Sequence, residues 1–270
     1  MGHFRFAAVG DNCVDRFQAP INQSLIGGNA VNVAVQLARL GHSSFYFGAV
    51  GKDVDGERTT RALKDNGVET SCLQLRPGNT AYTNIEQTAS GDRIIAYEDF
   101  GTCAGYRPSE EDIAVLKTMD HVHLGWLDDA GELRRRLSSE GVSLSQDISV
   151  NANPENLGVA GLTVAFASAG ARGAPADSLL SYLLANGAAC AVVTCGSDGA
   201  LARRGEEFGE SSIAPVTVVD TTGAGDSFIA GFLAAFVAQQ PLVACLEQGR
   251  DCAAITCTHV GGFPQQPLPL

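Results

Sequence analysis

The segment VTVVDTTGAGDSFIAGFLAAF, residues 216–236, is the most informative stretch of the chain. Its β-branched run predicts a strand that ends at Asp220, a Gly-Ala-Gly turn follows, and a helix rich in small residues is predicted to begin near Asp226. In that order, the backbone N–H groups of residues 223–225 converge beside the positive end of a helix, which predicts a site for a phosphoryl group. Asp226 would lie beside the developing anion, which suits a residue that takes a proton from a hydroxyl nucleophile. The alternative is that Asp226 only caps the helix.

Around this segment, short β-branched or aromatic runs alternate with longer amphipathic runs. This alternation predicts an α/β sheet with helices on both faces. Ser109 opens an S-x-x-D pattern before an apolar run, which predicts a helix N-cap. Strands are expected at 4–10, 44–51, near Cys72, and at 121–126, 142–148, 162–168 and 190–196, helices at 28–41 and 55–66, and a surface tail at 264–270.

The rhythm changes between residues 79 and 99. The runs TAYTNIEQT and RIIAYED alternate like half-buried strands, and Ala89-Ser90-Gly91-Asp92 between them is typical of a hairpin turn. We therefore expect a hairpin that lies outside the main sheet.

Composition and charge exclude several classes of protein. The chain has 270 residues, of which 45% are apolar and 18% charged, as expected of a globular protein with a substantial core. Its net charge of −12 disfavours binding to nucleic acid or to anionic membranes. The eight cysteines form no C-x-x-C pair, and neither a signal peptide nor a membrane-spanning run is evident, so we expect a cytoplasmic protein.

Two common nucleotide-binding motifs are absent. Gly51-Lys52 is not a P-loop, because Tyr46 stands where the first glycine should be. The Gly-Ala-Gly turn is not followed by x-x-G, so a simple dinucleotide site is also disfavoured.

Two segments together resemble the signatures of the ribokinase-like (PfkB) carbohydrate kinases. DTTGAGD at 220–226, followed by Gly231, is similar to the C-terminal signature of that family, and GGNAVNVA at 27–34 resembles the N-terminal one. Their order and separation agree with the family, and the resemblance covers almost the whole chain. It implies a three-layer α/β/α sandwich with a Rossmann-like central sheet. It further implies a single domain, 1–270, with a small β lid contributed by about 12–24 and 79–99.

The resemblance also assigns roles to individual residues. It implies that Asp226 is the catalytic base and that Gly223, Ala224 and Gly225 form an anion hole. Sugar contacts are implied for Asp15, Gly28, Asn29, Asn32 and, more weakly, Asp11. The resemblance also implies a nucleotide loop with Thr194, Gly196 and Gly199, and a monovalent-cation site at Asp220 and Thr222. Several have ordinary alternatives. Asp15 could be a solvated loop residue, Asn29 a helix cap, Thr194 part of a simple hairpin and Asp220 a strand-end cap.

One family motif is missing. Members usually carry N-x-x-E after a middle strand, and this motif is linked to magnesium positioning. Here the strand is followed by Ser168-Ala169-Gly170-Ala171, without a carboxylate. Phosphoryl transfer needs a cation between the β- and γ-oxygens, so we nominate Asp147, at the end of another predicted strand, as a magnesium ligand. The alternative is an ordinary strand-end aspartate.

These features predict an ATP-dependent sugar kinase that uses Mg²⁺ and, as some family members do, a monovalent cation such as K⁺. The resemblance implies a fructosamine such as fructoselysine as acceptor, through its 6-hydroxyl, and a homodimer. Alternative acceptors are ribose, fructose, 2-keto-3-deoxygluconate or a nucleoside. The alternative from another class is a sugar-binding regulator without turnover. His121 and His123 alternate on a predicted strand and are expected to be satisfied core histidines.

Overall fold

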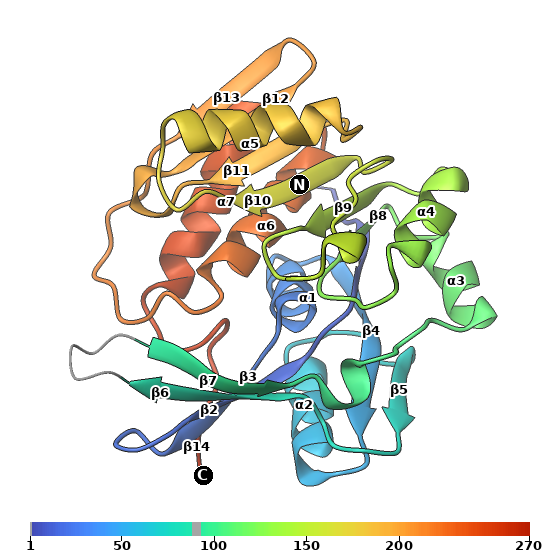
Figure 1. Cartoon of the computed structure of the whole chain (residues 1–270), viewed down its shortest axis with the longest axis vertical. Helices are drawn as coiled ribbons and strands as arrows, with labels where there is room; N and C mark the ends of the chain where they lie inside the picture. The colour runs from blue at the N-terminus through green and yellow to red at the C-terminus, as the bar shows by residue number, and fades with distance from the viewer. Residues whose placement is uncertain (1, 88–92) are drawn as a thin grey trace.

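The computed structural model describes residues 2–87 and 93–270, and its centre is a nine-stranded sheet (Figure 1). Seven neighbouring strands are parallel, and two antiparallel strands extend one edge. In sheet order they are β13 (Glu207–Ser211), β12 (Ala200–Arg204), β11 (Ala191–Thr194), β10 (Val164–Ser168), β9 (Leu144–Asp147), β8 (His121–Leu124), β1 (Arg5–Val9), β4 (Ser43–Gly51) and β5 (Leu73–Arg76).

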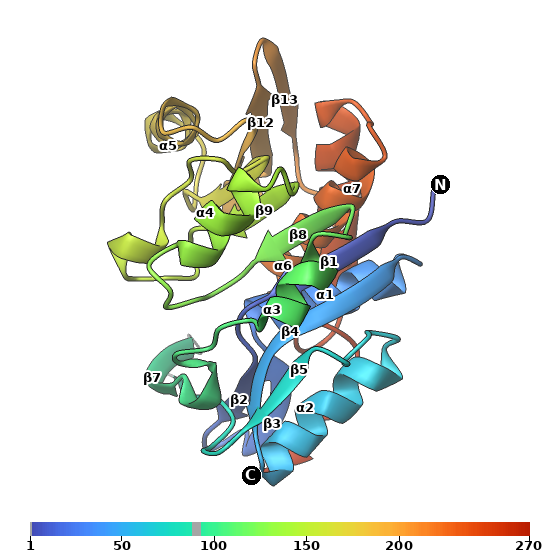
Figure 2. The ribbon, with the colours of Figure 1, turned by 90° about the vertical axis from the view of Figure 1, so that its right-hand side faces the viewer.

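Helices cover both faces of this sheet, as Figure 2 shows. Phe6 and Ala8 of β1 pack in one core with α1 (Asn29–Arg39), α2 (Val54–Asp65), α6 (Ala224–Val237) and α7 (Leu242–Thr256). Ala7 and Val9 face a second core with α3 (Glu110–Leu116), α4 (Glu132–Ser139) and α5 (Ala174–Ala185). Because both faces of the strand are buried, its sequence is an almost continuous apolar run. The predicted three-layer α/β/α sandwich is confirmed.

Local signals set the helix boundaries as expected. The Ser109 side chain accepts from the Asp112 N–H at 3.1 Å, and the Asp112 carboxylate accepts from the Ser109 N–H at 2.9 Å. This capping box confirms the N-cap predicted from S-x-x-D. Short 3₁₀ turns at Gly101–Cys103, Pro154–Asn156 and Gly196–Asp198 complete the helical segments.

A second sheet of five strands, called the lid sheet here, lies beside the main sheet (Figure 1). Its order is β14 (Leu268–Pro269), β3 (Gln23–Gly27), β2 (Cys13–Phe17), β6 (Tyr82–Gln87) and β7 (Arg93–Asp99). The first predicted lid segment therefore extends to Gly27 rather than ending near residue 24. The hairpin turn predicted at 89–92 lies outside the described residues.

The C-terminus belongs to the lid sheet, although a surface tail was expected there. Leu268 and Pro269 pair with β3, and the Gln265 side chain exchanges two 2.7 Å hydrogen bonds with the backbone of Ile26. Leu268 is nevertheless 46% exposed, so the attachment depends on backbone pairing. Pairing of this kind leaves no apolar pattern in the sequence.

The expected strand before Asp220 is also wrong. Residues 212–219 leave β13 as an irregular extended segment, and Val216, Val218 and Val219 are 40%, 59% and 57% exposed. A β-branched run usually indicates a buried strand. Here it forms an exposed connection that leads to α6.

The order of the parallel strands fixes where a ligand can bind. From β1 the chain builds β4 and β5 on one side and then returns to place β8, β9, β10 and β11 on the other side. This reversal makes the junction of β1 and β8 a topological switch point, beyond which open α/β sheets generally bind their ligands.

Candidate active site

Asp226 lies in the first turn of α6, where two asparagines of α1 hold its carboxylate. Asn29 Nδ2 donates to Oδ1 and Asn32 Nδ2 donates to Oδ2, both at 2.7 Å. The two donors are three residues apart on α1, so they face the same side of that helix. Residues predicted to contact sugar thus orient the predicted base.

The environment of Asp226 favours its neutral form. Burial raises the pKa of Asp226 from 3.8 to about 7, and the charges of Asp147 and Asp11 act in the same direction. The hydrogen bonds from Asn32 and Asn29 lower the pKa and oppose part of this rise. A carboxylate with a pKa near 7 can accept a proton from a hydroxyl group at neutral pH.

The predicted anion hole is only partly available. Gly223, with φ 74°, precedes α6, and the Ala224 N–H donates to the Thr221 carbonyl at 3.1 Å. Within the described residues, the N–H groups of Gly225 and Asp226 have no hydrogen-bond acceptor. A Cβ at Gly225 would meet nothing within 4 Å. Gly223 N–H likewise has no acceptor among the described residues, so the donors open to an anion are those of 223, 225 and 226.

Asp11 caps α1 from the loop after β1. Its Oδ2 accepts from the Asn29 N–H at 2.7 Å, and its Oδ1 accepts from the Trp126 N–H at 3.0 Å. The chain can enter the helix there because Gly28 has φ 102°, and a Cβ at Gly28 would lie 2.7 Å from Asn12 Cα. The side chain that caps this helix is therefore the Asp11 carboxylate and not the Asn29 amide.

Asp15 lies on β2 of the lid sheet and is half-buried. Its Oδ2 would be 2.9 Å from a Cβ at Gly27, so the side chain packs over the glycine of the neighbouring strand. Burial and the negative charges of Asp15 and Asp11 raise the pKa of the Cys13 thiol. Both carboxylates therefore act on the same region between the lid sheet and β1.

The Trp126 backbone N–H donates to Asp11, and its ring is part of an aromatic stack that was not singled out from the sequence. The Trp126 ring stacks on Phe100 with centroids 3.9 Å apart and an interplanar angle of 9°. Phe100 directly follows β7, and Trp126 lies two residues beyond β8. Position at the carboxyl end of a central strand was the only available signal for Trp126.

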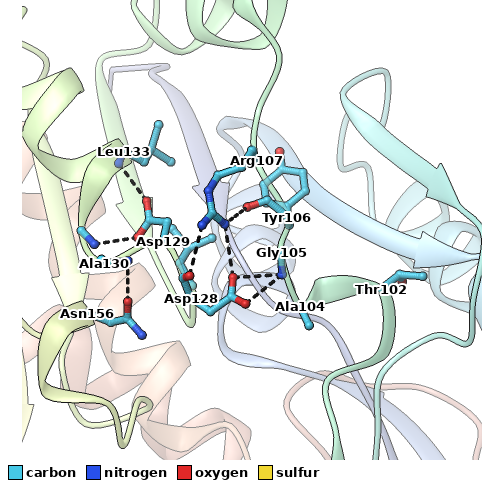
Figure 3. Close-up of polar contacts among 12 residues, drawn as sticks. Thr102, Ala104, Gly105, Tyr106, Arg107, Asp128, Asp129, Ala130, Leu133 and Asn156 are labelled. Carbon is cyan, nitrogen blue, oxygen red and sulfur yellow. Dashed lines mark hydrogen bonds and ion pairs between the residues drawn. The ribbon is translucent and has the colours of Figure 1, made fainter.

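Polar contacts anchor the loop that carries Trp126, as Figure 3 shows. The Asp128 carboxylate accepts from the Gly105 N–H at 2.8 and 3.0 Å, and Arg107 Nη1 donates to Asp128 Oδ1 at 3.3 Å. Asp129 accepts from the Leu133 N–H at 2.8 Å at the start of α4. The loop is thus attached both to the segment after the lid sheet and to α4, a helix that packs on the main sheet.

A cavity of about 520 Å³ adjoins the start of α6. Thr194, Gly196 and Gly199, predicted as the nucleotide loop, line it together with Gly225. The exposed side chains of Ile213, Val216 and Val218 form its apolar wall. A cavity with an apolar wall and backbone donors at one end is suited to a nucleotide.

Asp220 and Thr222 are brought together in the turn before α6. Asp220 Oδ1 accepts from Thr222 N and Oγ1 at 3.0 and 2.9 Å, and Oδ2 accepts from the Gly261 N–H at 3.0 Å. These contacts are those of a carboxylate that caps a turn. The monovalent-cation site stays a prediction.

Asp147 ends β9 close to Asp226 and is 7% exposed. Its Oδ1 accepts from Ser149 N and Oγ at 2.9 and 2.6 Å, and its Oδ2 accepts from Asn29 Nδ2 at 3.3 Å. These contacts are typical of a satisfied strand-end carboxylate. Within 2–87 and 93–270, no group of three His, Cys, Asp or Glu side chains could hold a metal ion, so the nomination of Asp147 stays a prediction from sequence.

The chain belongs to the pfkB family of carbohydrate kinases, whose pattern it matches over residues 18–136 and 165–267. It is thus a carbohydrate kinase, a phosphotransferase acting on a hydroxyl group. The fold is ribokinase-like: the Arabidopsis thaliana ribokinase complexed with ribose and ATP superposes with a TM-score of 0.85 at 22% identity, covering 96% of this chain and 94% of that one. Across the described residues, we find no helix with the length and apolarity needed to span a membrane.

Two relatives refine the comparison. The chain is 36% identical to the fructoselysine 6-kinase of Escherichia coli K12, over 95% of this chain and 98% of that one. It is 32% identical to the fructosamine kinase FrlD of Bacillus subtilis 168, over 96% and 93% of the two chains.

Proposed function

We propose that this enzyme transfers the γ-phosphate of MgATP to the 6-hydroxyl of a fructosamine such as fructoselysine. The names of the two relatives, similar over nearly their full lengths, support this acceptor. The observation that carries the kinase chemistry is the position of Asp226, held by two amides beside the N–H groups of residues 225 and 226 at the end of the cavity.

In the proposed reaction, the primary hydroxyl gives its proton to the Asp226 carboxylate. Its oxygen forms a bond to the γ-phosphorus while the bond to the β–γ bridging oxygen breaks, and ADP leaves. The N–H groups of Gly225 and Asp226 stabilise charge on the transferring phosphoryl group. Magnesium enters with ATP, as part of the MgATP substrate, and neutralises phosphate charge.

On the sugar side, Asp15 and the Trp126–Phe100 stack are the proposed contacts. Carboxylate oxygens accept from sugar hydroxyls, and an aromatic face packs on the apolar face of a sugar ring. The structure gives Asp11, Asn29 and Asn32 protein partners, so we assign them to positioning.

The test is release of ADP with a panel of acceptors: fructoselysine, fructoseglycine, fructose, ribose, 2-keto-3-deoxygluconate and a nucleoside. We expect the highest kcat/KM with a fructosamine and a phosphorus NMR signal coupled to the C6 protons of the product. Asp226→Asn should lower kcat by roughly 10²–10⁴-fold, the usual contribution of a general base. Asp251→Asn, on the exposed face of α7, is the matched control.

The same panel decides between the alternatives. A higher kcat/KM with ribose, fructose, the keto-deoxy acid or the nucleoside would replace the proposed acceptor and keep the kinase. Sugar binding without ADP release for every acceptor would favour the regulator. The position of Asp226 beside open backbone donors favours turnover.

We also propose a homodimer that forms through the lid sheet. Strand β7 is at the edge of that sheet, and its Ile94, Ile95 and Tyr97 are 52%, 63% and 52% exposed. An apolar edge strand is suited to pairing with a second chain. Light scattering should give twice the chain mass, and Tyr97→Lys should give the monomer mass. The eight free cysteines support a reducing, cytoplasmic location, which fractionation of the source cells would test.

A further inference from the structure

A row of buried polar side chains runs along β8 and β9 and ends at the active site. His121 and His123 of β8 and Ser145 of β9 are all 0% exposed. The Ser145 hydroxyl lies 2.8 Å from His121 Nε2 and 2.9 Å from His123 Nδ1. At one end, His121 Nδ1 is 2.8 Å from the Ser143 hydroxyl, and at the other, His123 Nε2 is 3.2 Å from Asn29 Oδ1.

The direction of every hydrogen bond in this row follows from its last member. The Asn29 amide nitrogen is 2.7 Å from the Asp226 carboxylate and 3.3 Å from that of Asp147, so it must be the donor there. Its oxygen therefore faces His123 and can only accept. His123 must then carry its hydrogen on Nε2.

The donor and the acceptor in the remaining hydrogen bonds follow from the position of the hydrogen on His123. His123 Nδ1 accepts from the Ser145 hydroxyl, and the Ser145 oxygen accepts from the Nε2–H of His121. His121 Nδ1 is then an acceptor that faces the Ser143 hydroxyl at 2.8 Å, although this hydroxyl is also in reach of Thr163 Oγ1 at 3.3 Å. Burial lowers the pKa of both histidines to about 3, so each ring is neutral and has the single N–H that this arrangement requires.

We propose that His123, oriented through Ser145 and His121, is a positioning residue for phosphoryl transfer, because it fixes the Asn29 amide with its NH₂ group toward Asp226. This inference rests on the proposed role of Asp226 as the base. An asparagine side chain can turn by 180° at little steric cost. Without a donor at His123, the buried Asn29 oxygen would lose its hydrogen-bond partner, and an amide that turns to regain one moves its NH₂ group away from Asp226, which then loses one of two amide donors.

The effect on Asp226 has a defined sign. The Asn29 bond lowers the pKa of Asp226, whereas the charges of Asp147 and Asp11 raise it, and Asn32 supplies the second stabilising amide. The acid limb is the fall of kcat/KM toward low pH as Asp226 becomes protonated. Loss of the hydrogen bond from Asn29 to Asp226 should shift this limb to higher pH. A purely structural role of His123 would lower the stability and leave that limb in place.

The first experiment needs no variant. In the full-length enzyme labelled with ¹⁵N-histidine, His121 and His123 should both show the neutral Nε2–H tautomer from pH 5 to pH 9. An Nδ1–H tautomer or an imidazolium at His123 in that range would overturn the proposal. This measurement does not depend on activity, so it is separate from the test of the proposed function.

The second experiment compares His123→Leu, which removes the donor, with His123→Gln, whose amide can still donate to Asn29. We expect His123→Leu to lower kcat/KM at pH 7 about tenfold or more, the usual worth of a hydrogen bond to a charged group, and to raise the acid-limb midpoint. His123→Gln should restore most of the wild-type kcat/KM and of the wild-type acid-limb midpoint. In both variants the KM for ATP should stay unchanged. His42→Leu, which removes a buried imidazole outside this row, is the matched control.

Combination with Asn29→Ala completes the test. If His123 acts through Asn29, His123→Leu should have no further effect on the pH profile in the Asn29→Ala background. A folded His123→Leu enzyme with the wild-type acid limb would refute the inference and leave the kinase proposal intact. Full activity of Asp226→Asn would instead refute the base on which both proposals depend.

Discussion

Asp226→Asn should stabilise the protein while it removes catalysis. In the folded state the pKa of Asp226 rises from 3.8 to about 7, chiefly through burial. Because each pH unit is worth about 1.4 kcal/mol, ionising this carboxyl in the folded protein costs about 4 kcal/mol more than in the unfolded chain. Asparagine carries no charge and avoids that cost.

The net stabilisation by Asp226→Asn is smaller than the cost of ionising Asp226 in the folded protein. Asn29 and Asn32 each donate to one oxygen of Asp226, and asparagine offers only one oxygen. One amide then loses its acceptor, at a cost of about 1–3 kcal/mol. We therefore expect a net stabilisation of about 1–3 kcal/mol above pH 8, or roughly 2–12 °C in Tm for a chain of this size.

The pH dependence makes this prediction specific. A carboxyl whose pKa is raised on folding stabilises the folded state fully below its unfolded pKa of 3.8, and this stability is lost as the pH rises from there to the folded pKa of about 7. The difference in Tm between Asp226→Asn and wild type should therefore grow as the pH rises from about 4 to about 7 and stay nearly constant from there to pH 9. Scanning calorimetry across that range measures it, with Asp251→Asn as control. A difference that is constant with pH, or a variant that is less stable at pH 9, would refute the reasoning.

Three further outcomes are expected. Below pH 7, kcat/KM should fall about tenfold per pH unit as Asp226 becomes protonated, in steady-state assays from pH 5 to 9. Gly225→Ala should keep the wild-type Tm but raise KM for ATP, because its methyl group meets no protein atom and enters the space beside the phosphate donors. Gly223→Ala should lower the stability by more than about 2 kcal/mol in urea unfolding, because Gly223 has φ 74° and an added Cβ would lie 2.3 Å from Gly262 Cα.

The sequence was sufficient for elements whose signal is local and periodic. The strands at 121–126, 162–168 and 190–196 and the helix after Gly28 lie where their apolar patterns predicted them, because both faces of a central parallel sheet are buried. The exposed run at 216–219 was misjudged, because β-branched residues that line a ligand cavity have the same pattern as a buried strand. Strand β14 was missed because its attachment depends on backbone pairing.

The site was predictable in its residues and less so in its contacts. The signatures brought Asn29, Asn32 and Asp226 into one prediction, and the structure places the three in direct contact. That both asparagines hold Asp226 could not be predicted, because it depends on the register of α1 against α6. His123 and Trp126 lack a motif, and only their place at the carboxyl end of β8 connects them with the site.

The distribution of charge in the site connects its stability with its choice of substrate. Asp11, Asp147 and Asp226 influence one another electrostatically, and the groups that contact them are amides, a hydroxyl and backbone N–H groups. Such donors orient carboxylates without neutralising them, so the free enzyme has an excess of negative charge where an anionic phosphoryl group must arrive. Among the described residues, the contacts of these three carboxylates include no cationic side chain, so we expect positive charge to enter with the ligands. In the proposed reaction, the magnesium of MgATP would supply part of it, and the protonated amine of a fructosamine would supply a charge that fructose lacks. On this reasoning, the carboxylates that keep Asp226 basic enough at neutral pH also favour an aminated sugar over a neutral one.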